Sequence, residues 1–147
     1  IYACNLYSQY DNFNNEKKAH FVTALIKKIQ NCVENDEVVL KLFGTGNPLR
    51  QFIHASDLAD IIVQSIDKIL KTDFNVAGDE CHSIREMAEI ALDVLDKDLI
   101  LNFDTLMPDG QIRKDACNKK MRELFPEFEF KSFANGIESV YNSVLNE

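Results

Sequence analysis

Positive charge is scarce in this 147-residue chain, which carries 16 Lys and Arg against 24 Asp and Glu and has a formal net charge of −8. No basic run occurs, and the pairs Lys17-Lys18 and Lys119-Lys120 are isolated. Because a nucleic-acid surface needs a basic stripe, we expect no nucleic-acid partner. The chain also lacks an apolar run near the ~20 residues that span a bilayer, so we expect no membrane segment. No signal-peptide pattern opens the chain. Scattered cysteines favour reduced thiols, and we expect a cytoplasmic protein.

Metal-binding and nucleotide-binding signatures are missing as well. The four cysteines are scattered without a C-x-x-C pair, and His20, His54 and His82 form no ligand spacing with them. We therefore expect no metal site and reduced thiols. The chain contains no P-loop, no glycine-rich dinucleotide fingerprint and no Tyr-x-x-x-Lys pair. Cofactor binding therefore cannot depend on these motifs within the chain.

The first residue is Ile1 rather than methionine, and the segment 1–7 reads as the middle of a buried strand. We therefore expect the chain to be a fragment of a longer protein. Hydrophobic residues make up 46% of the sequence, and no Pro- or Ser-rich linker interrupts it. Residues 1–147 are accordingly predicted to form a single domain with a real core.

Strand-like and helix-like segments alternate along the chain, which predicts an α/β fold. Ser56 is expected to cap one helix, and Ser83 with Glu86 forms a capping box for the next. The helix after Ser56 is expected to bury one apolar stripe, composed of Leu58, Ile61, Ile62, Ser65, Ile66 and Ile69. Strands are expected at 1–7, 37–43, 51–54, 73–77 and 99–103, and helices at 19–35, 56–71, 83–96, 118–124 and from 132 or 133 onward.

The most informative stretch follows a predicted strand and reads Phe43-Gly44-Thr45-Gly46-Asn47-Pro48-Leu49-Arg50. Its two glycines can adopt positive φ and let the backbone approach a ligand, while Pro48 stiffens the turn. Arg50 is thereby mounted rigidly, and a guanidinium can clamp a phosphate with two parallel hydrogen bonds. The pattern favours a small phosphorylated ligand. The alternative is a surface arginine paired with an acid.

Two further side chains are candidates for chemistry. His20 precedes a predicted helix and could act as a general acid near neutral pH, although a solvated histidine is the simpler interpretation. Asp109, in Pro108-Asp109-Gly110, could accept hydrogen bonds from sugar hydroxyls, although this tripeptide is also a common turn in which Asp bonds its own backbone. His54 and His82 have no companion groups and are interpreted as structural.

Taken in order, these segments resemble the GDP-L-fucose synthase family, which belongs to the extended short-chain dehydrogenases/reductases. Each match is weak alone, but together they are colinear over almost the whole chain. The matching segments are Asn5-Leu6-Tyr7, Asp11-Asn12-Phe13, His20, Phe43 to Phe52, Asp57-Leu58-Ala59, Asn75 to Gly78, Ser83 to Glu86, Phe103-Asp104-Thr105, Pro108-Asp109-Gly110 and Arg113-Lys114.

The resemblance implies the carboxy-terminal, substrate-binding part of an extended Rossmann-type fold, with the last strands of the cofactor sheet. The amino-terminal NADP-binding half and its Ser, Tyr and Lys catalytic set would be absent. The family epimerises C3 and C5 of GDP-4-keto-6-deoxy-D-mannose and then reduces C4 with NADPH. The isolated chain is therefore expected to be inactive, and the full-length protein is expected to be a homodimer.

The resemblance also implies site residues. His20 matches the family's catalytic histidine and lies near the NADP(H) cofactor, together with the strand end Ala3, Cys4, Asn5 and Leu6. GDP-sugar would be held by Lys28, Phe43, Arg50 and Asp109. The sequence departs from the family at Ser8-Gln9-Tyr10, where Gly-Pro-His is usual, and at Phe43, where tryptophan is common.

Two alternatives stay open at this point. The chain could come from another NAD(P)-dependent sugar-nucleotide epimerase or reductase, because the contacts that select the base cannot be placed from the sequence. It could also be a binding module that kept the fold and lost catalysis.

Overall fold

The computed structural model describes residues 1–13, 20–68 and 71–145, and it has the α/β architecture that the sequence predicts. Ala19, Ile69 and Leu70, which fall in predicted helices, lie outside the described residues. The helices are α1 (Phe21–Glu34), α2 (Ala55–Asp67), α3 (Ile84–Val94), α4 (Lys119–Leu124) and α5 (Phe133–Leu145). The strands are β1 (Tyr2–Ala3), β2 (Asn5–Tyr7), β3 (Val39–Phe43), β4 (Leu49–Arg50), β5 (Phe52–His54), β6 (Asn75–Val76), β7 (His82–Ser83), β8 (Ile100–Asp104) and β9 (Arg113–Lys114).

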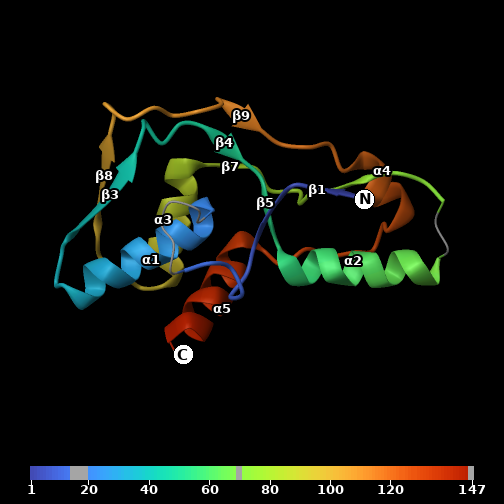
Figure 1. Ribbon diagram of the computed structural model, residues 1–147, viewed down its shortest axis with the longest axis horizontal. Coiled ribbons are helices and arrows are strands. Elements are labelled where there is room, and N and C mark those ends of the chain that lie inside the picture. The colour runs from blue at the N-terminus through green and yellow to red at the C-terminus, as the bar shows by residue number, and fades with distance from the viewer. Residues whose placement is uncertain (14–19, 69–70, 146–147) are drawn as a thin grey trace.

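The strands form short ladders rather than one continuous sheet. β1 pairs with β6, β2 with β5 and β3 with β8, all in parallel, while β4 lies between the antiparallel β7 and the parallel β9. The molecule is elongated, with the β3–β8 ladder at one end and α2 and α4 at the other (Figure 1). β5 runs between the two ends and connects them (Figure 1).

The larger hydrophobic cluster gathers the inner faces of α1, α3 and α5 against β3. The predicted capping box of α3 is confirmed, because Ser83 Oγ accepts from the Glu86 amide and the Glu86 carboxylate accepts from the Ser83 amide. These local bonds fix where α3 begins and therefore which of its faces meets the core.

The start of α2 differs from the prediction that Ser56 caps it. The N-cap is His54, whose Nδ1 accepts from the Ser56 amide at 3.2 Å, so Ser56 already lies in the first turn. An extended backbone and an unprotonated ring nitrogen give His54 the same capping ability as a serine hydroxyl. The structural role that the sequence assigns to His54 is therefore confirmed.

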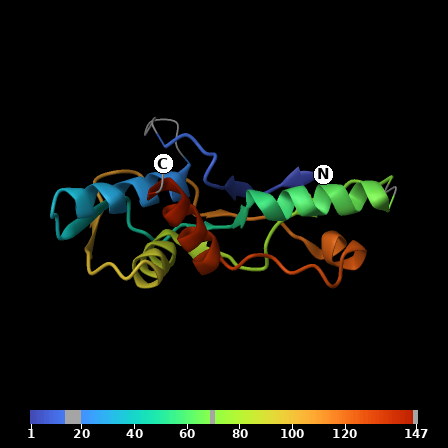
Figure 2. The same ribbon diagram turned by 90° about the horizontal axis from the view of Figure 1, so that it is seen from below.

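α2 does not bury the whole stripe that its sequence predicts. Ile61 is fully buried in a second cluster with Ile53, Val76 and Phe125, whereas Ile62 is 42% and Ile66 69% exposed. The apolar stripe is wide enough to pack against two neighbouring surfaces. Among the described residues, only the side with Ile61 is covered. The outer side of α2 lies open along the edge of the molecule (Figure 2). Within the described ranges, no helix has the length and apolar character needed to cross a membrane.

Candidate ligand cavity and adjoining hollow

A cavity of about 460 Å³ opens between α1, the end of β3, β4 and the loop that follows β8. Lys28, Phe43, Arg50 and Asp109, the four residues that the sequence predicts to bind GDP-sugar, all line it. They come from segments far apart in the chain, so the fold assembles them in one place. The cavity walls are completed by Phe21, Ala24, Leu25, Leu42, Ile84 and Pro108.

The glycine-rich loop beside the cavity has the backbone that its sequence predicts. Gly44 and Gly46 have φ values of 78° and 81°, a region that side chains strongly disfavour. Both glycines also touch neighbours closely: a Cβ on Gly46 would lie 2.6 Å from the Phe103 ring, and one on Gly44 would overlap the Asp109 carboxylate. The loop is therefore fixed both by its backbone and by the groups packed on it.

Arg50 is half-buried at the end of β4, between β7 and β9. Its Nη1 donates to the Leu49 carbonyl at 2.8 Å, and Nη2 lies beside Gly110. Among the residues that the structure describes, no carboxylate lies within ion-pair distance of this guanidinium. The alternative of a surface arginine paired with an acid therefore does not hold there, and hydrogen-bonding capacity is left for a ligand.

Lys28 and Phe43 also line the cavity. Lys28 Nζ donates to the Lys41 carbonyl at 2.8 Å and sits 4.6 Å from the centre of the Phe43 ring. This ring is 61% exposed, although it belongs to a strand with buried neighbours. An exposed aromatic face beside a cation offers both stacking and charge to a phosphorylated, ring-containing ligand.

Asp109 lies on the exposed loop after β8, and its carboxylate is held by a residue 64 positions earlier. Oδ1 accepts from the Thr45 amide at 2.6 Å and Oδ2 from the Thr45 hydroxyl at 2.8 Å. Neither sequence interpretation anticipated this arrangement, because Asp109 bonds a distant loop and not its own turn. No local pattern pairs the two residues, so Thr45 is missed when the sequence is read alone.

His20 lies outside this cavity. It is the exposed N-cap residue of α1, its side chain makes no capping bond, and it lines a separate hollow of about 290 Å³ with Leu6, Tyr10 and Asp11. The next residue, Phe21, already lines the main cavity, so the start of α1 borders both spaces. The structure thus brings His20 together with Leu6, one of the expected cofactor residues, and close to the ligand cavity.

The other expected cofactor residues lie along β1 and β2. Ala3 is exposed, and Cys4 is half-buried, with burial raising the pKa of its thiol. Asn5 donates from Nδ2 to the Gln51 carbonyl at 2.9 Å, which fixes its side chain against β5. These three residues border neither the main cavity nor the hollow beside His20.

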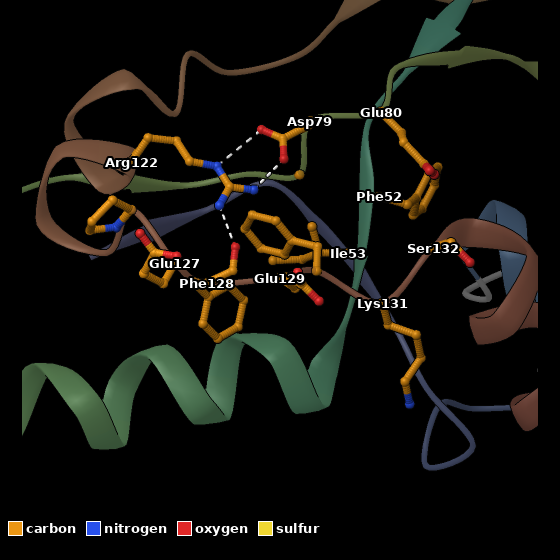
Figure 3. Close-up of a pocket in the computed structure, with 13 residues that line it drawn as sticks. Phe52, Ile53, Asp79, Glu80, Arg122, Glu127, Phe128, Glu129, Lys131 and Ser132 are labelled. Atoms are coloured by element: carbon orange, nitrogen blue, oxygen red, sulfur yellow. Dashed lines mark hydrogen bonds and ion pairs between the residues drawn. The ribbon is translucent and has the colours of Figure 1, made fainter.

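A further cavity of about 440 Å³ lies between β5, the residues around Asp79 and the segment 126–132 (Figure 3). Arg122 extends toward it, but Asp79 and the Phe128 carbonyl already engage its guanidinium (Figure 3). The arginine also holds the pKa of the Asp79 carboxyl below its usual range. Because the Arg122 guanidinium already bonds protein groups, this cavity is less suited to bind a phosphate than the cavity at Arg50. Among the described residues, no cluster of His, Cys, Asp and Glu is arranged to bind a metal.

Comparison with known proteins identifies the class to which this fold and these cavities belong. A model of the NAD dependent epimerase/dehydratase family matches residues 1–77. The chain therefore belongs to this family, which is defined by enzymes that depend on a nicotinamide cofactor.

Individual relatives narrow the class further. GDP-L-fucose synthase 1 of Arabidopsis thaliana is 34% identical over 121 residues, a match that covers 82% of this chain and 37% of the relative. GDP-L-colitose synthase of Yersinia pseudotuberculosis is 31% identical, with 98% and 47% covered. The crystal structure of a GDP-L-fucose synthetase from Naegleria fowleri bound to NADP has a TM-score of 0.88 at 26% identity, with 98% and 45% covered. The predicted resemblance is confirmed, and the chain spans less than half the length of these relatives.

Proposed function

We propose that this chain is the substrate-binding part of a GDP-L-fucose synthase and that its main cavity holds a GDP-sugar. The observation that carries the proposal is the convergence of Lys28, Phe43, Arg50 and Asp109 on one cavity. In this proposal Arg50 and Lys28 neutralise the diphosphate, and the exposed Phe43 ring packs against a flat or apolar face of the ligand. The similarity to GDP-L-fucose synthases supports guanosine as the base.

The proposed reaction epimerises C3 and C5 of GDP-4-keto-6-deoxy-D-mannose and reduces C4. The C4 carbonyl acidifies the protons on C3 and C5, so a base can remove each one and an acid must return it on the opposite face. His20 is the proposed acid, because its exposed imidazole borders the space next to the ligand cavity. The hollow at His20 combines the apolar Leu6 with the polar Ser8 and Asp11, which suits a nicotinamide ring and its carboxamide. NADPH would supply the hydride for C4.

The isolated chain is proposed to bind ligand but not to turn it over, because it lacks a Tyr-x-x-x-Lys pair and a dinucleotide fingerprint. The open side of α2, with Ile62 and Ile66, fits a surface that a cofactor-binding half would cover. We further propose a cytoplasmic, homodimeric full-length protein. Incubation of the chain with NADPH and the keto sugar should leave the nicotinamide absorbance unchanged, and clear turnover would contradict this part.

Calorimetric titration of the 147-residue chain with GDP tests the binding proposal directly. Wild-type protein should bind GDP, and Arg50→Ala should weaken binding by roughly 10- to 100-fold, the value of a charged hydrogen-bonding group. Arg50→Lys should bind with intermediate affinity because it keeps the charge and loses the fork. Lys97→Ala, which removes one positive charge after α3, is the control and should bind like wild type. An Arg50→Ala protein that binds as tightly as wild type would contradict the proposal.

A second candidate follows from the 31% identity to a GDP-L-colitose synthase. That relative shares the GDP group in its name, so the phosphate-binding cavity would serve either sugar. Parallel titrations with GDP, UDP and dTDP separate a guanosine enzyme from other sugar-nucleotide enzymes. Titrations with GDP-L-fucose and GDP-L-colitose then compare the two sugars.

A further inference from the structure

Thr45 and Asp109 form a two-point contact across the edge of the ligand cavity. The Thr45 amide and hydroxyl donate to the two carboxylate oxygens of Asp109 at 2.6 and 2.8 Å. We propose that Thr45 is a positioning residue, which holds the Asp109 carboxylate where it accepts hydrogen bonds from the ribose hydroxyls of a bound nucleotide. This inference rests on the function proposed above and adds the part of the ligand that Asp109 recognises.

Asp109 needs such an anchor because its own loop holds it weakly. The segment between β8 and β9 has no regular structure, and Leu106 and Ile112 are 94% and 83% exposed. The other hydrogen bonds of this segment lie near its ends, where the Leu106 and Met107 amides donate to Asp104 and the Leu49 amide donates to the Ile112 carbonyl. A carboxylate on a loop with so little packing would sample many positions. The bonds to Thr45 remove that freedom.

Thr45 itself is held firmly. The Gly44 amide donates to the Asp104 carbonyl at 2.9 Å, and the Arg85 amide donates to the Gly46 carbonyl at 2.9 Å. The Arg85 guanidinium covers the Phe103 ring at 4.2 Å, and that ring fills the space that a side chain at Gly46 would need. Contacts with α3 and β8 therefore fix the glycine loop in place. Within this fixed loop, Thr45 contacts Asp109.

The chemistry of the cavity indicates what this carboxylate binds. Arg50 and Lys28 supply positive charge for phosphates, whereas a carboxylate repels them. A carboxylate only accepts hydrogen bonds, and each of its oxygens has a second lone pair beyond the one that Thr45 occupies. It must therefore meet a neutral donor close to the diphosphate. The ribose 2′- and 3′-hydroxyls are such donors, and the N–H edge of a base is the competing possibility.

Binding measurements on matched variants test the inference. Thr45→Val removes the hydroxyl at nearly constant volume, Thr45→Ser restores it, and Thr72→Val removes a hydroxyl that bonds Lys120 far from the cavity. Far-ultraviolet circular dichroism and thermal melts establish that each variant is folded. Each protein is titrated with GDP, 2′,3′-dideoxy-GDP and IDP, the last of which lacks the exocyclic amine of guanine.

Wild type should prefer GDP over dideoxy-GDP. Thr45→Val should lose on the order of tenfold in GDP affinity, the value of a hydrogen bond to a charged group, with little loss for dideoxy-GDP. Thr45→Ser and Thr72→Val should behave like wild type. The inference would be overturned if Thr45→Val lost affinity equally for GDP and dideoxy-GDP, lost none, or lost only the ability to distinguish GDP from IDP. In each of these cases, GDP binding by the wild-type protein would still support the proposed function. Failure of wild type to bind GDP would overturn both.

Discussion

Replacement of Gly136 by alanine tests how closely α5 packs onto β2. Gly136 is buried in α5, and a Cβ there would lie 2.7 Å from Cζ of Tyr7 and would overlap its hydroxyl. Tyr7 is only 3% exposed, and its ring contacts the rings of Phe52, His54 and Phe133 with centroids 6.3, 5.4 and 5.7 Å away. The tyrosine therefore has little room to move away from the added methyl group.

Two opposing effects set the size of the change. Alanine favours the helix over glycine by about 1 kcal/mol, because it restricts the unfolded chain. Overpacking of a rigid, buried contact costs typically 1–3 kcal/mol, and the Tyr7 ring places this site at about the upper value. The free energy of unfolding should therefore fall by about 2 kcal/mol, which lowers Tm by roughly 4–8 °C for a chain of this size.

Thermal and urea denaturation followed by circular dichroism measure this difference. Ser139→Ala, at an exposed position of the same helix, is the control and should change stability by only a few tenths of a kcal/mol. The double variant with Tyr7→Phe should lose less stability than the two single changes predict, because removal of the hydroxyl relieves part of the overlap. If Gly136→Ala were as stable as wild type or more so, the close approach of α5 to β2 would be refuted.

Further predictions concern the helix caps. Burial and the charge of Lys131 lower the pKa of His54 below its usual 6.5, so the unfolded chain binds a proton that the folded chain excludes. Stability should therefore fall as pH drops below about 6.5. The urea midpoint should decrease between pH 7.5 and pH 5.5, and it should decrease less in His54→Asn, which keeps a capping acceptor; equal slopes would contradict this. Ser83→Ala should cost about 1 kcal/mol and about 2–4 °C in Tm, measured against Ser143→Ala, and an unchanged Tm would show that the cap is dispensable.

The parts of the fold that could be predicted from the sequence are those set by neighbouring residues. The Ser83 capping box and the positive φ of Gly44 and Gly46 depend on a few consecutive positions, and both are confirmed. The sequence favours Ser56 as the cap of α2 because serine is the commoner capping residue. His54 is the cap instead because its Nδ1 points toward the Ser56 amide, and the sequence does not reveal the orientation of that ring.

Features set by distant partners could not be predicted in this way. β7 and β9 are two-residue strands that exist only because β4 lies between them, so their own sequences carry no strand signal. The exposure of Ile66 depends on what covers α2, and its periodicity says only that one face is apolar. The grouping of Lys28, Phe43, Arg50 and Asp109 in one cavity follows from the family resemblance and not from their local sequence. Local patterns would have suggested only Arg50 and Asp109, for separate reasons.

The course of α1 bears on how the proposed ligand binding and the proposed acid role of His20 would be coupled. Phe21, Ala24, Leu25 and Lys28 recur at three- and four-residue spacing, so one face of the helix lines the cavity over about two turns. His20 lies one residue beyond that face and about 12 Å along the helix axis from Lys28, at a rise of about 1.5 Å per residue. A diphosphate held at Lys28 and Arg50 can reach His20 only through a further group that extends along α1. A nucleotide alone would fill the cation end of the cavity, whereas a nucleotide-sugar would bring its sugar ring toward the imidazole.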